Sequence, residues 1–236
     1  VSEITSIDDS TKRKTFLDNF KPLNIEDLIH RESESVTRLK YKKKIIKNKV
    51  VLVTGGGGSI GSELCRKILL LKPKLLIIIE NNESSLYSIS NELLNLSNTT
   101  NLKFVLGSIG NRILLEKIIL DNKVDMIFHS AAYKHVPLVE NNPIEGIKNN
   151  VIYTRLICEL SINLEVKHLI LISTDKAVRP TNIMGASKRL AEIIFQSYAK
   201  KVKTSKMKNY NTIFAMVRFG NVIGSSGSVL PLFQKQ

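Results

Sequence analysis

The sequence predicts an α/β fold with a doubly wound, mostly parallel sheet that is covered by helices on both faces. From residue 50 onwards, apolar stretches of strand length alternate with longer stretches that show helical apolar spacing. Most strand-length stretches are apolar throughout, as expected for strands buried on both faces. Each connection is long enough to hold a helix, so right-handed crossovers should place helices on both sides of the sheet.

The expected elements follow one another in a regular order. Asn111 is expected to cap the helix at 111–121 and Ser84 the helix at 84–97, because side-chain oxygens accept hydrogen bonds from N–H groups of the first turn. Pro143 suits the first turn of the helix at 143–164. Strands are expected at 50–54, 75–80, 102–106, 124–129, 166–172 and 212–218, and helices at 24–29, 59–71, 84–97, 111–121, 143–164 and 184–201.

Three glycines, Gly55, Gly58 and Gly61, join the first strand of this sheet to its helix. The first permits a tight turn, the second lets the backbone approach a diphosphate, and the third lets the helix pack closely. The diphosphate would rest on the N–H groups at the positive end of the new helix, around Ser59 and Ile60. This strand, turn and helix predict a Rossmann-type dinucleotide site.

Cofactors of such sheets bind at the carboxyl ends of the strands, so residues that follow strands are the candidates. Glu80 ends the second strand, 19 residues after Gly61, where its carboxylate could accept hydrogen bonds from an adenosine ribose. A carboxylate there also favours NAD over NADP, because it repels a 2′-phosphate. Ser108 and Ile109 could pass beside the adenine, and the small Ala131 and Ala132 would let a cofactor lie against the backbone.

Two further loops are candidates for substrate binding. Lys134 and His135 follow the fourth strand and could face a substrate diphosphate, although a plain surface loop is the alternative. Arg218, Asn221 and Ser225 belong to a loop rich in Gly, Ser and Asn after the last strand. That loop could wrap a sugar nucleotide or form a flexible turn.

The loop after the fifth strand holds the candidates for catalysis. Thr174, Asp175 and Lys176 place a hydroxyl, a carboxylate and an amine in consecutive positions, which suits acid–base chemistry and equally suits an ordinary loop before a helix. Lys188 lies four residues after Met184 on the next helix, on the same helix face. A thioether cannot accept a proton, so Met184 is expected to pack in the core.

The bulk composition excludes several classes. The chain has 236 residues, 43% of them hydrophobic and 24% charged, as in ordinary globular proteins. Its net charge of +14 comes largely from lysine-rich runs at 38–49 and 200–208. Few aromatic residues lie among these lysines, so we expect solvated segments, a membrane surface as the alternative, and no nucleic acid. Cys65 and Cys158 are expected as reduced core thiols, with no disulfide and no metal site.

Several segments together resemble the extended short-chain dehydrogenase/reductases, and more narrowly the polysaccharide-biosynthesis UDP-N-acetylglucosamine 4,6-dehydratases. They are Val-Thr-Gly-Gly-Gly-Gly-Ser-Ile-Gly-Ser-Glu-Leu at 53–64, Ala-Ala-Tyr-Lys-His-Val-Pro-Leu-Val-Glu at 131–140, Ser-Thr-Asp-Lys-Ala at 173–177, Met-Gly-Ala-Ser-Lys-Arg at 184–189, and Arg-Phe-Gly-Asn-Val-Ile-Gly-Ser-Ser-Gly-Ser-Val at 218–229. The resemblance covers roughly residues 20 to 236. The long members of this family, which carry an N-terminal membrane region, tolerate methionine at the position of Met184, where most relatives carry tyrosine.

The resemblance implies that bound NAD oxidises carbon 4 of UDP-N-acetylglucosamine or a related UDP-sugar and that water is then eliminated. It implies Lys176 as the base at carbon 5, with a pKa depressed by nearby positive charge, and Asp175 as the acid at carbon 6, with a raised pKa. Thr174 with a water would take the 4-hydroxyl proton. Lys188 would hold the nicotinamide ribose. A carbon-4 epimerase, a dehydratase that also inverts carbon 5, and a non-catalytic dinucleotide-binding module remain alternatives.

The resemblance also bears on the organisation of the protein. Residues 1–48 are expected to form a linker and N-terminal segment, and 49–236 the NAD-binding domain with the start of a substrate-binding region. The C-terminal substrate subdomain would largely be missing, as would an N-terminal membrane region. A cytoplasmic homo-oligomer is expected, at the cytoplasmic face of the inner membrane if that region is present. Ser108 and Arg179 depart from the usual aspartate and asparagine of the family.

Overall fold

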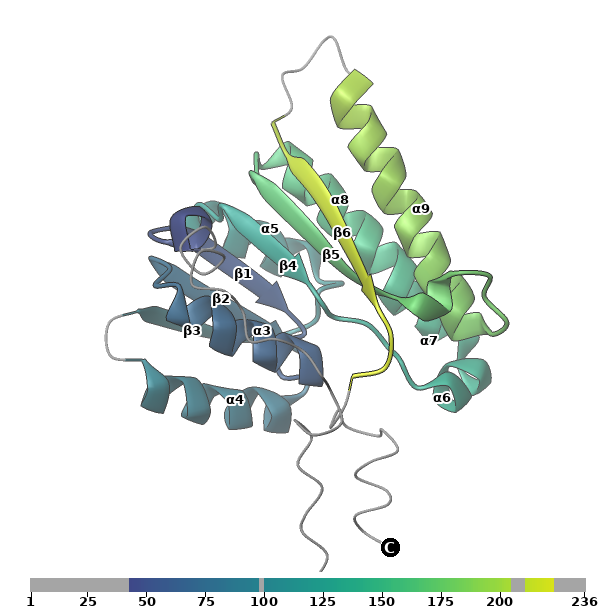
Figure 1. Ribbon diagram of the computed structural model, residues 1–236, viewed down its shortest axis with the longest axis horizontal. Coiled ribbons are helices and arrows are strands. Elements are labelled where there is room, and N and C mark those ends of the chain that lie inside the picture. The colour runs from purple at the N-terminus through teal and green to yellow at the C-terminus, as the bar shows by residue number, and fades with distance from the viewer. Residues whose placement is uncertain (1–42, 98–99, 205–210, 223–236) are drawn as a thin grey trace, which may run out of the picture. The chain divides into compact units, whose positions relative to one another are not determined.

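The structure is a computed structural model, and it describes residues 43–97, 100–204 and 211–222 (Figure 1). The chain divides into two units after Lys40, and all described residues lie in the second unit. The predicted helix at 24–29 and the candidate Ser225 lie outside the described residues. Whether a domain boundary falls near residue 48 stays a prediction.

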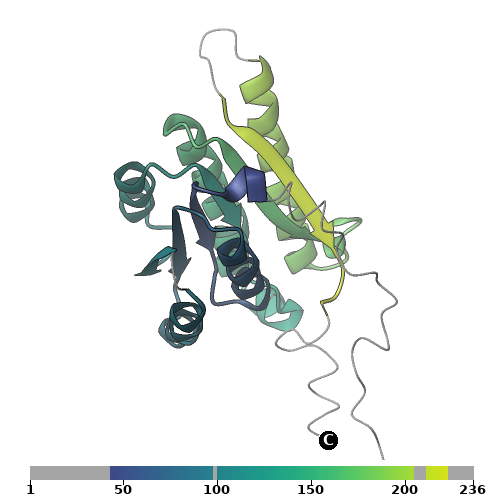
Figure 2. The same ribbon diagram turned by 60° about the vertical axis from the view of Figure 1, so that its left-hand side comes forward.

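A six-stranded sheet forms the centre of the second unit, and every neighbouring pair of strands is parallel (Figures 1 and 2). The strand order is β3-β2-β1-β4-β5-β6, so the winding reverses between β1 and β4. This confirms the predicted doubly wound parallel fold. The strands are β1 (Val50–Thr54), β2 (Leu75–Glu80), β3 (Asn101–Leu106), β4 (Met126–His129), β5 (His168–Thr174) and β6 (Ile213–Phe219).

Helices cover both faces of the sheet. Two of them, α3 (Ser59–Leu70) and α4 (Glu83–Leu96), pack on one face, whereas α5 (Arg112–Asn122), α8 (Tyr153–Asn163) and α9 (Ile183–Thr204) pack on the other. Side chains of β1 point alternately to the two faces of the sheet. Val50 and Leu52 belong to one core cluster, and Val51 and Val53 belong to the other. Shorter helical segments are α6 (Val136–Asn141), α7 (Pro143–Ile147), a π-helix at Lys148–Ile152 and a 3₁₀ turn at Asp175–Ala177.

Several predicted details were wrong. Helix α4 is capped by Asn82, whose Oδ1 accepts a hydrogen bond of 2.8 Å from Ser85 N, and not by Ser84. The predicted single helix at 143–164 is divided into α7, the π-helix and α8, preceded by α6 in a segment expected to be a loop. Strand β4 begins at Met126, because Val124 N still bonds to Ile119 O of α5. Asn111 caps α5 as predicted, accepting from Leu114 N.

The core residues agree with the composition. Cys65 on α3 and Cys158 on α8 are free, buried thiols, as predicted, and burial raises the pKa of both. Across the described ranges, no helix combines the length and the apolar character needed to cross a bilayer.

Candidate functional site

The glycine loop after β1 has a shape that two of its glycines make possible. Gly55 has φ +67°, and a Cβ there would lie 2.6 Å from the Cα of Ala131. A Cβ on Gly61 would lie 2.0 Å from the carbonyl oxygen of Gly55. Both contacts are with backbone atoms, which cannot move aside cheaply. These two glycines are therefore required by the packing of the protein itself.

Gly58 is different, because packing does not explain it. Among the described residues, a Cβ on Gly58 would meet just the carbonyl oxygen of Gly55, at 3.4 Å, which is ordinary contact. Its φ of −74° suits any residue. Gly58 is also the cap residue of α3, so it offers no side chain to the first N–H groups of that helix. An open cradle at a helix start fits the diphosphate of a dinucleotide, and the residues present therefore fit NAD.

Glu80, at the end of β2, holds this loop in place. Its Oε2 accepts a hydrogen bond of 3.1 Å from Gly57 N, and its Oε1 accepts from Asn81 N at 2.9 Å and Asn82 N at 3.1 Å. The carboxylate thus lies beside the glycine loop, where the adenosine ribose is predicted to lie. Its contact with that ribose stays a prediction.

The residues predicted to lie near the adenine follow β3. The Oγ of Ser108 accepts a hydrogen bond of 3.0 Å from Gly110 N. The side chain of Ile109 is buried in the core cluster on the α5 face of the sheet, so its backbone is the part that could face a base. Their roles in cofactor binding stay predictions.

His129 is the last residue of β4, beside β1, where the winding of the sheet reverses. It is the register partner of Thr54, whose Oγ1 lies 2.8 Å from His129 Nδ1. The other ring nitrogen lies 3.0 Å from Thr154 Oγ1. Burial, followed by the nearby charge of Lys188, lowers the pKa of His129 to about 3. His129 is thus a neutral packing residue with both ring nitrogens hydrogen-bonded.

A buried asparagine that the sequence analysis missed supports the loop after β4. Asn150, in the π-helix, accepts from Tyr133 N at 2.8 Å and donates to Tyr133 O at 3.0 Å. Its amide also donates to Ser187 Oγ of α9 at 2.9 Å. The loop that presents the exposed Lys134 and His135 is therefore fixed through Tyr133. Two adjacent asparagines within a predicted helix were the signal that could have identified it.

Lys188 and Met184 are both buried near the start of α9. The Nζ of Lys188 donates a hydrogen bond of 2.9 Å to Ile172 O on β5. Burial lowers the pKa of Lys188 to about 8, against the opposing effect of the negative charge of Glu192. Met184 is 2% exposed, as predicted for a core residue.

Asp175 and Lys176 are neighbours at the carboxyl end of β5, and both are partly exposed. Lys176 Nζ lies 3.6 Å from Asp175 Oδ1 and donates to Asn221 Oδ1 at 2.9 Å. Thr174 Oγ1 also donates to Asp175 Oδ1, at 2.9 Å. The structure thus brings Asn221, a predicted substrate-binding residue, into one cluster with the three predicted catalytic residues of this loop. The positive charge predicted beside Lys176 is absent from these contacts, since its ion-paired neighbour is a carboxylate.

The pKa of Asp175 differs in direction from the prediction. An acid at carbon 6 requires a raised pKa, but the hydrogen bond from Thr174 and the charge of Lys176 hold the pKa of Asp175 below its ordinary value. Burial would raise the pKa of this carboxyl group, but the side chain of Asp175 is 57% exposed in the structure.

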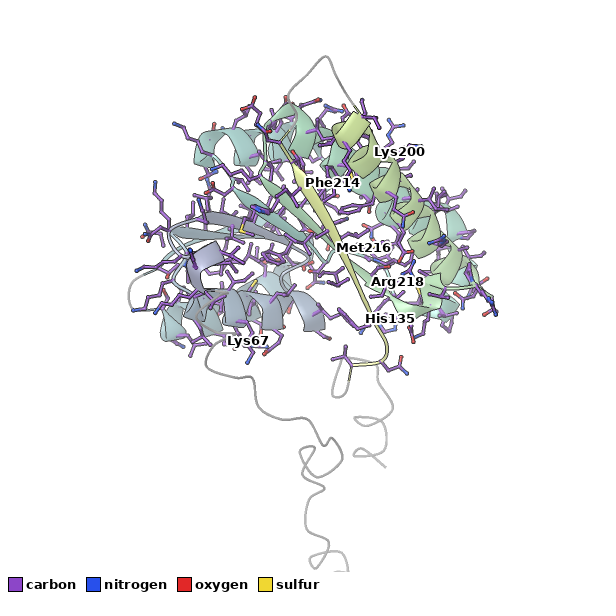
Figure 3. All side chains as sticks on the ribbon, turned by 45° about the horizontal axis from the view of Figure 1, so that its top comes forward. Lys67, His135, Lys200, Phe214, Met216 and Arg218 are labelled. Carbon is purple, nitrogen blue, oxygen red and sulfur yellow. The ribbon has the colours of Figure 1, made fainter. Side chains whose placement is uncertain are left out.

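Arg218 is engaged by a carboxylate that the sequence analysis also missed. Figure 3 shows Arg218 beyond Phe214 and Met216, toward the carboxyl end of β6. Its Nε donates to Glu192 Oε1 at 2.7 Å and its Nη2 to Oε2 at 2.6 Å. The predicted contact of Arg218 with a substrate stays a prediction. An acid four residues after Lys188, on an apolar-periodic helix, was the signal for Glu192.

In residues 43–97, 100–204 and 211–222, no group of His, Cys, Asp and Glu side chains is arranged to hold a metal ion.

Several known proteins are similar to this chain. A family model described as "Polysaccharide biosynthesis protein" matches residues 51–236. The capsular polysaccharide biosynthesis protein CapD of Staphylococcus aureus is 39% identical over 99% of this chain and 38% of its own length. A UDP-N-acetylglucosamine 4,6-dehydratase (inverting) of Campylobacter jejuni is 35% identical over 79% of this chain and 53% of its own length.

An epimerase and a solved structure are similar to this chain as well. A UDP-glucose 4-epimerase of Rickettsia rickettsii is 34% identical over 80% of this chain and 53% of its own length. The solved structure of Pen from Bacillus thuringiensis matches with a TM-score of 0.74 and 35% identity, covering 81% of this chain and 58% of that one. The chain thus spans about a third to a half of the curated relatives it matches. It belongs to the polysaccharide biosynthesis protein family of extended short-chain dehydrogenase/reductases, whose members include nucleotide-sugar dehydratases and epimerases.

Proposed function

We propose that the protein containing this chain is an NAD-dependent 4,6-dehydratase that converts UDP-N-acetylglucosamine into a UDP-4-keto-6-deoxy sugar for surface polysaccharide biosynthesis. The observation that supports it is the cluster of Thr174, Asp175, Lys176 and Asn221 at the carboxyl end of β5, in the same strand–helix unit as the buried amine of Lys188. An elimination needs a base and an acid side by side, and an amine and a carboxyl group in contact can supply them. Oxidation of a hydroxyl alone does not require this pair.

NAD, when bound, would take hydride from carbon 4 of the hexose and return it to carbon 6, so no net oxidation results. Thr174 and a water would accept the proton of the 4-hydroxyl. Lys176 would remove the proton on carbon 5, which the carbon-4 ketone acidifies. Asp175 would protonate the departing hydroxyl of carbon 6, and one water leaves. Lys188 would hold the nicotinamide ribose, and Glu80 the adenosine ribose.

The contact between Asp175 and Lys176 explains how both groups could reach the forms these steps require. The elimination needs a neutral amine and a protonated carboxyl group. Both side chains are exposed here, at 57% and 41%. When a sugar nucleotide covers them, desolvation disfavours both charged forms. A proton that passes from Lys176 to Asp175 then leaves both groups neutral with no change in total charge.

A carbon-4 epimerase is the second candidate, because relatives at 34–35% identity bear that name. An epimerase returns hydride to carbon 4 and has no need of an acid–base pair at carbons 5 and 6. A dehydratase that inverts carbon 5 would differ in stereochemistry alone.

The deciding experiment incubates the full-length protein with UDP-N-acetylglucosamine in D₂O and follows the sugar by NMR. The proposal expects a 4-keto-6-deoxy product with solvent deuterium at carbon 5. Asp175→Asn and Lys176→Ala should abolish this product while NAD stays bound. Lys167→Ala is the matched control, because Lys167 pairs with Asp125 just before β5, at the amino end of the strand.

The other outcomes identify the rivals. A 4-epimer without deuterium at carbon 5 indicates the epimerase, and an unchanged sugar with bound NAD indicates a non-catalytic module. Wild-type rates in either variant would remove the assignment of that residue. The configuration at carbon 5 of the product separates the inverting from the retaining dehydratase.

The proposal extends to setting and partners. We propose a cytoplasmic reaction, which the free buried thiols Cys65 and Cys158 support, since such thiols are typical of reducing compartments. We also propose a homo-oligomer, with membrane association through regions outside this chain. Sedimentation of the full-length protein and its partition between soluble and membrane fractions test both statements.

A further inference from the structure

A buried carboxylate joins the two strand ends that lead into the proposed catalytic cluster. Ser173 of β5 and Arg218 of β6 are register partners in the sheet. Glu192 of α9 contacts both, accepting from Ser173 Oγ at 2.7 Å and from two nitrogens of Arg218 at 2.7 and 2.6 Å. Arg189 donates to the same carboxylate at 3.1 Å. The side chain of Glu192 therefore connects α9 to β5 and β6 at the same register position of the two strands.

The environment makes this arrangement specific. The side chain of Glu192 is 0% exposed, so its charge depends entirely on protein partners. Burial alone would raise the pKa of Glu192, but the hydrogen bonds from Arg218, Ser173 and Arg189 lower it to about 2. A buried pair of this kind contributes little net stability compared with apolar residues, yet removing one partner leaves an uncompensated charge. We therefore expect the ion pair of Glu192 to fix the positions of the segments it joins rather than to add net stability.

The proposed catalytic residues begin directly after these strand ends. Thr174 and Phe219 are the last register pair, and Asp175 and Gly220 follow them. A Cβ on Gly220 would lie 3.3 Å from Asp175 Oδ2, so the two segments are already close. The bond from Lys176 Nζ to Asn221 Oδ1 spans the same gap. The separation of the two segments thus sets where the amine and the carboxylate can lie.

We propose that Glu192 is a positioning residue, which fixes the spacing between residues 174–176 and Asn221 by holding Ser173 and Arg218 together. The inference rests on the proposed function for its consequence in catalysis. Its structural part does not depend on that function. It also gives Arg218 a role inside the protein, which differs from the substrate contact predicted from sequence.

The test compares Glu192→Gln and Ser173→Ala with Asp125→Asn in the full-length protein. Asp125 is the matched control, because its carboxylate also joins separate segments, accepting from Val50 N and Lys167 Nζ at the amino end of the sheet. The measurements are kcat and KM for UDP-N-acetylglucosamine, the melting temperature, and amide hydrogen exchange at 174–177 and 219–222. NAD binding is measured on each variant.

We expect Glu192→Gln to lower kcat by about tenfold to a hundredfold, as misplacement of reacting groups by an ångström does, with KM changed by less than about threefold. Exchange at 174–177 and 219–222 should quicken in Glu192→Gln and, to a smaller extent, in Ser173→Ala. Asp125→Asn should lower the melting temperature without either effect. Ser173→Ala, which keeps the ion pair, decides the matter if Glu192→Gln does not fold.

Unchanged exchange in both segments would overturn the proposal, as would an unchanged kcat in Glu192→Gln. If the wild-type protein forms no keto sugar, the proposed function fails, and the exchange measurements alone decide whether Glu192 holds the segments together.

Discussion

The amine of Lys188 on α9 donates a hydrogen bond of 2.9 Å to the carbonyl oxygen of Ile172 on β5. This contact places a buried amine behind the strand that ends in Thr174. Because burial lowers the pKa of Lys188 to about 8, the group titrates within the pH range of ordinary experiments. It thus links the predicted cofactor site to the stability of the fold.

The first prediction concerns the pH dependence of stability. Between pH 8 and the ordinary lysine pKa near 10.5, the unfolded chain holds the proton of Lys188 while the folded chain has released it. Stability must therefore rise with pH across this window. Relative to Lys188→Met, the free energy of unfolding of the wild type should rise by about 1–3 kcal/mol from pH 7.5 to 10.

Urea unfolding at a series of pH values measures this difference. Lys67→Met, at an exposed lysine on α3, controls for the loss of one positive charge. A difference between wild type and Lys188→Met that stays constant with pH would contradict the prediction. Lys188→Met should also weaken NAD binding, measured by calorimetry.

The second prediction contrasts two glycines of one loop. Gly61→Ala would place a Cβ 2.0 Å from a backbone oxygen, so it should destabilise the fold by about 2–4 kcal/mol. Gly58→Ala meets ordinary contact, so its loss of stability should stay within about 1 kcal/mol. Its Cβ would instead obstruct the approach of a diphosphate, and NAD affinity should fall by about tenfold or more.

Thermal unfolding and NAD titration of both variants separate the two effects. If Gly58→Ala binds NAD as tightly as the wild type, the diphosphate does not approach that part of the loop.

Features that depend on local sequence could be predicted. The strands β1 and β2 are continuous apolar runs, and the glycine spacing directly follows β1, so period and turn chemistry define both. The cap at Asn111 is also local. Asn82 was missed in favour of Ser84 because both residues are good caps, and the sequence does not fix where the first turn begins.

The partners of the buried polar residues could not be predicted, because the contacts join residues far apart in the chain. Glu192 meets Arg218, and Asn150 meets both Tyr133 and Ser187, across separate elements. Their own segments read as ordinary amphipathic helix. The π-helix at Lys148–Ile152 has the same cause, since helical spacing alone predicts an unbroken α-helix there.

The third prediction concerns the choice between NAD and NADP. Glu80→Gln removes the charge and keeps one of the two side-chain oxygens that accept from Gly57 N, Asn81 N and Asn82 N. Repulsion of a 2′-phosphate should weaken, so the preference for NAD over NADP should fall by about fivefold to fiftyfold. Titration of both cofactors measures the ratio. Glu83→Gln, at the exposed first residue of α4, is the control and should leave that ratio unchanged.

The fourth prediction concerns Asn150, which supports the loop that presents Lys134 and His135. Asn150→Ala leaves the N–H and C=O of Tyr133 without their partner, and it removes one of the two hydrogen bonds of Ser187 Oγ, which still donates to Met184 O. Buried groups that lose their partners cost about 1–3 kcal/mol each, partly recovered by water, so a loss of about 2–4 kcal/mol is expected. Asn122→Ala is the control. It removes the hydrogen bond from the side-chain amide of Asn122 to Ile118 O within α5, and the loss of stability should be less than about 1 kcal/mol.

The same variant should affect substrate binding more than chemistry. If Lys134 and His135 contact the substrate diphosphate, a displaced loop raises KM for the UDP-sugar. Asp175 and Lys176 follow a different strand, β5, so kcat should be largely retained. Steady-state kinetics of the full-length protein at a temperature where Asn150→Ala is still folded measures both constants. A loss in kcat with an unchanged KM would show that the loop acts on the reacting groups, and would remove Lys134 and His135 as substrate contacts.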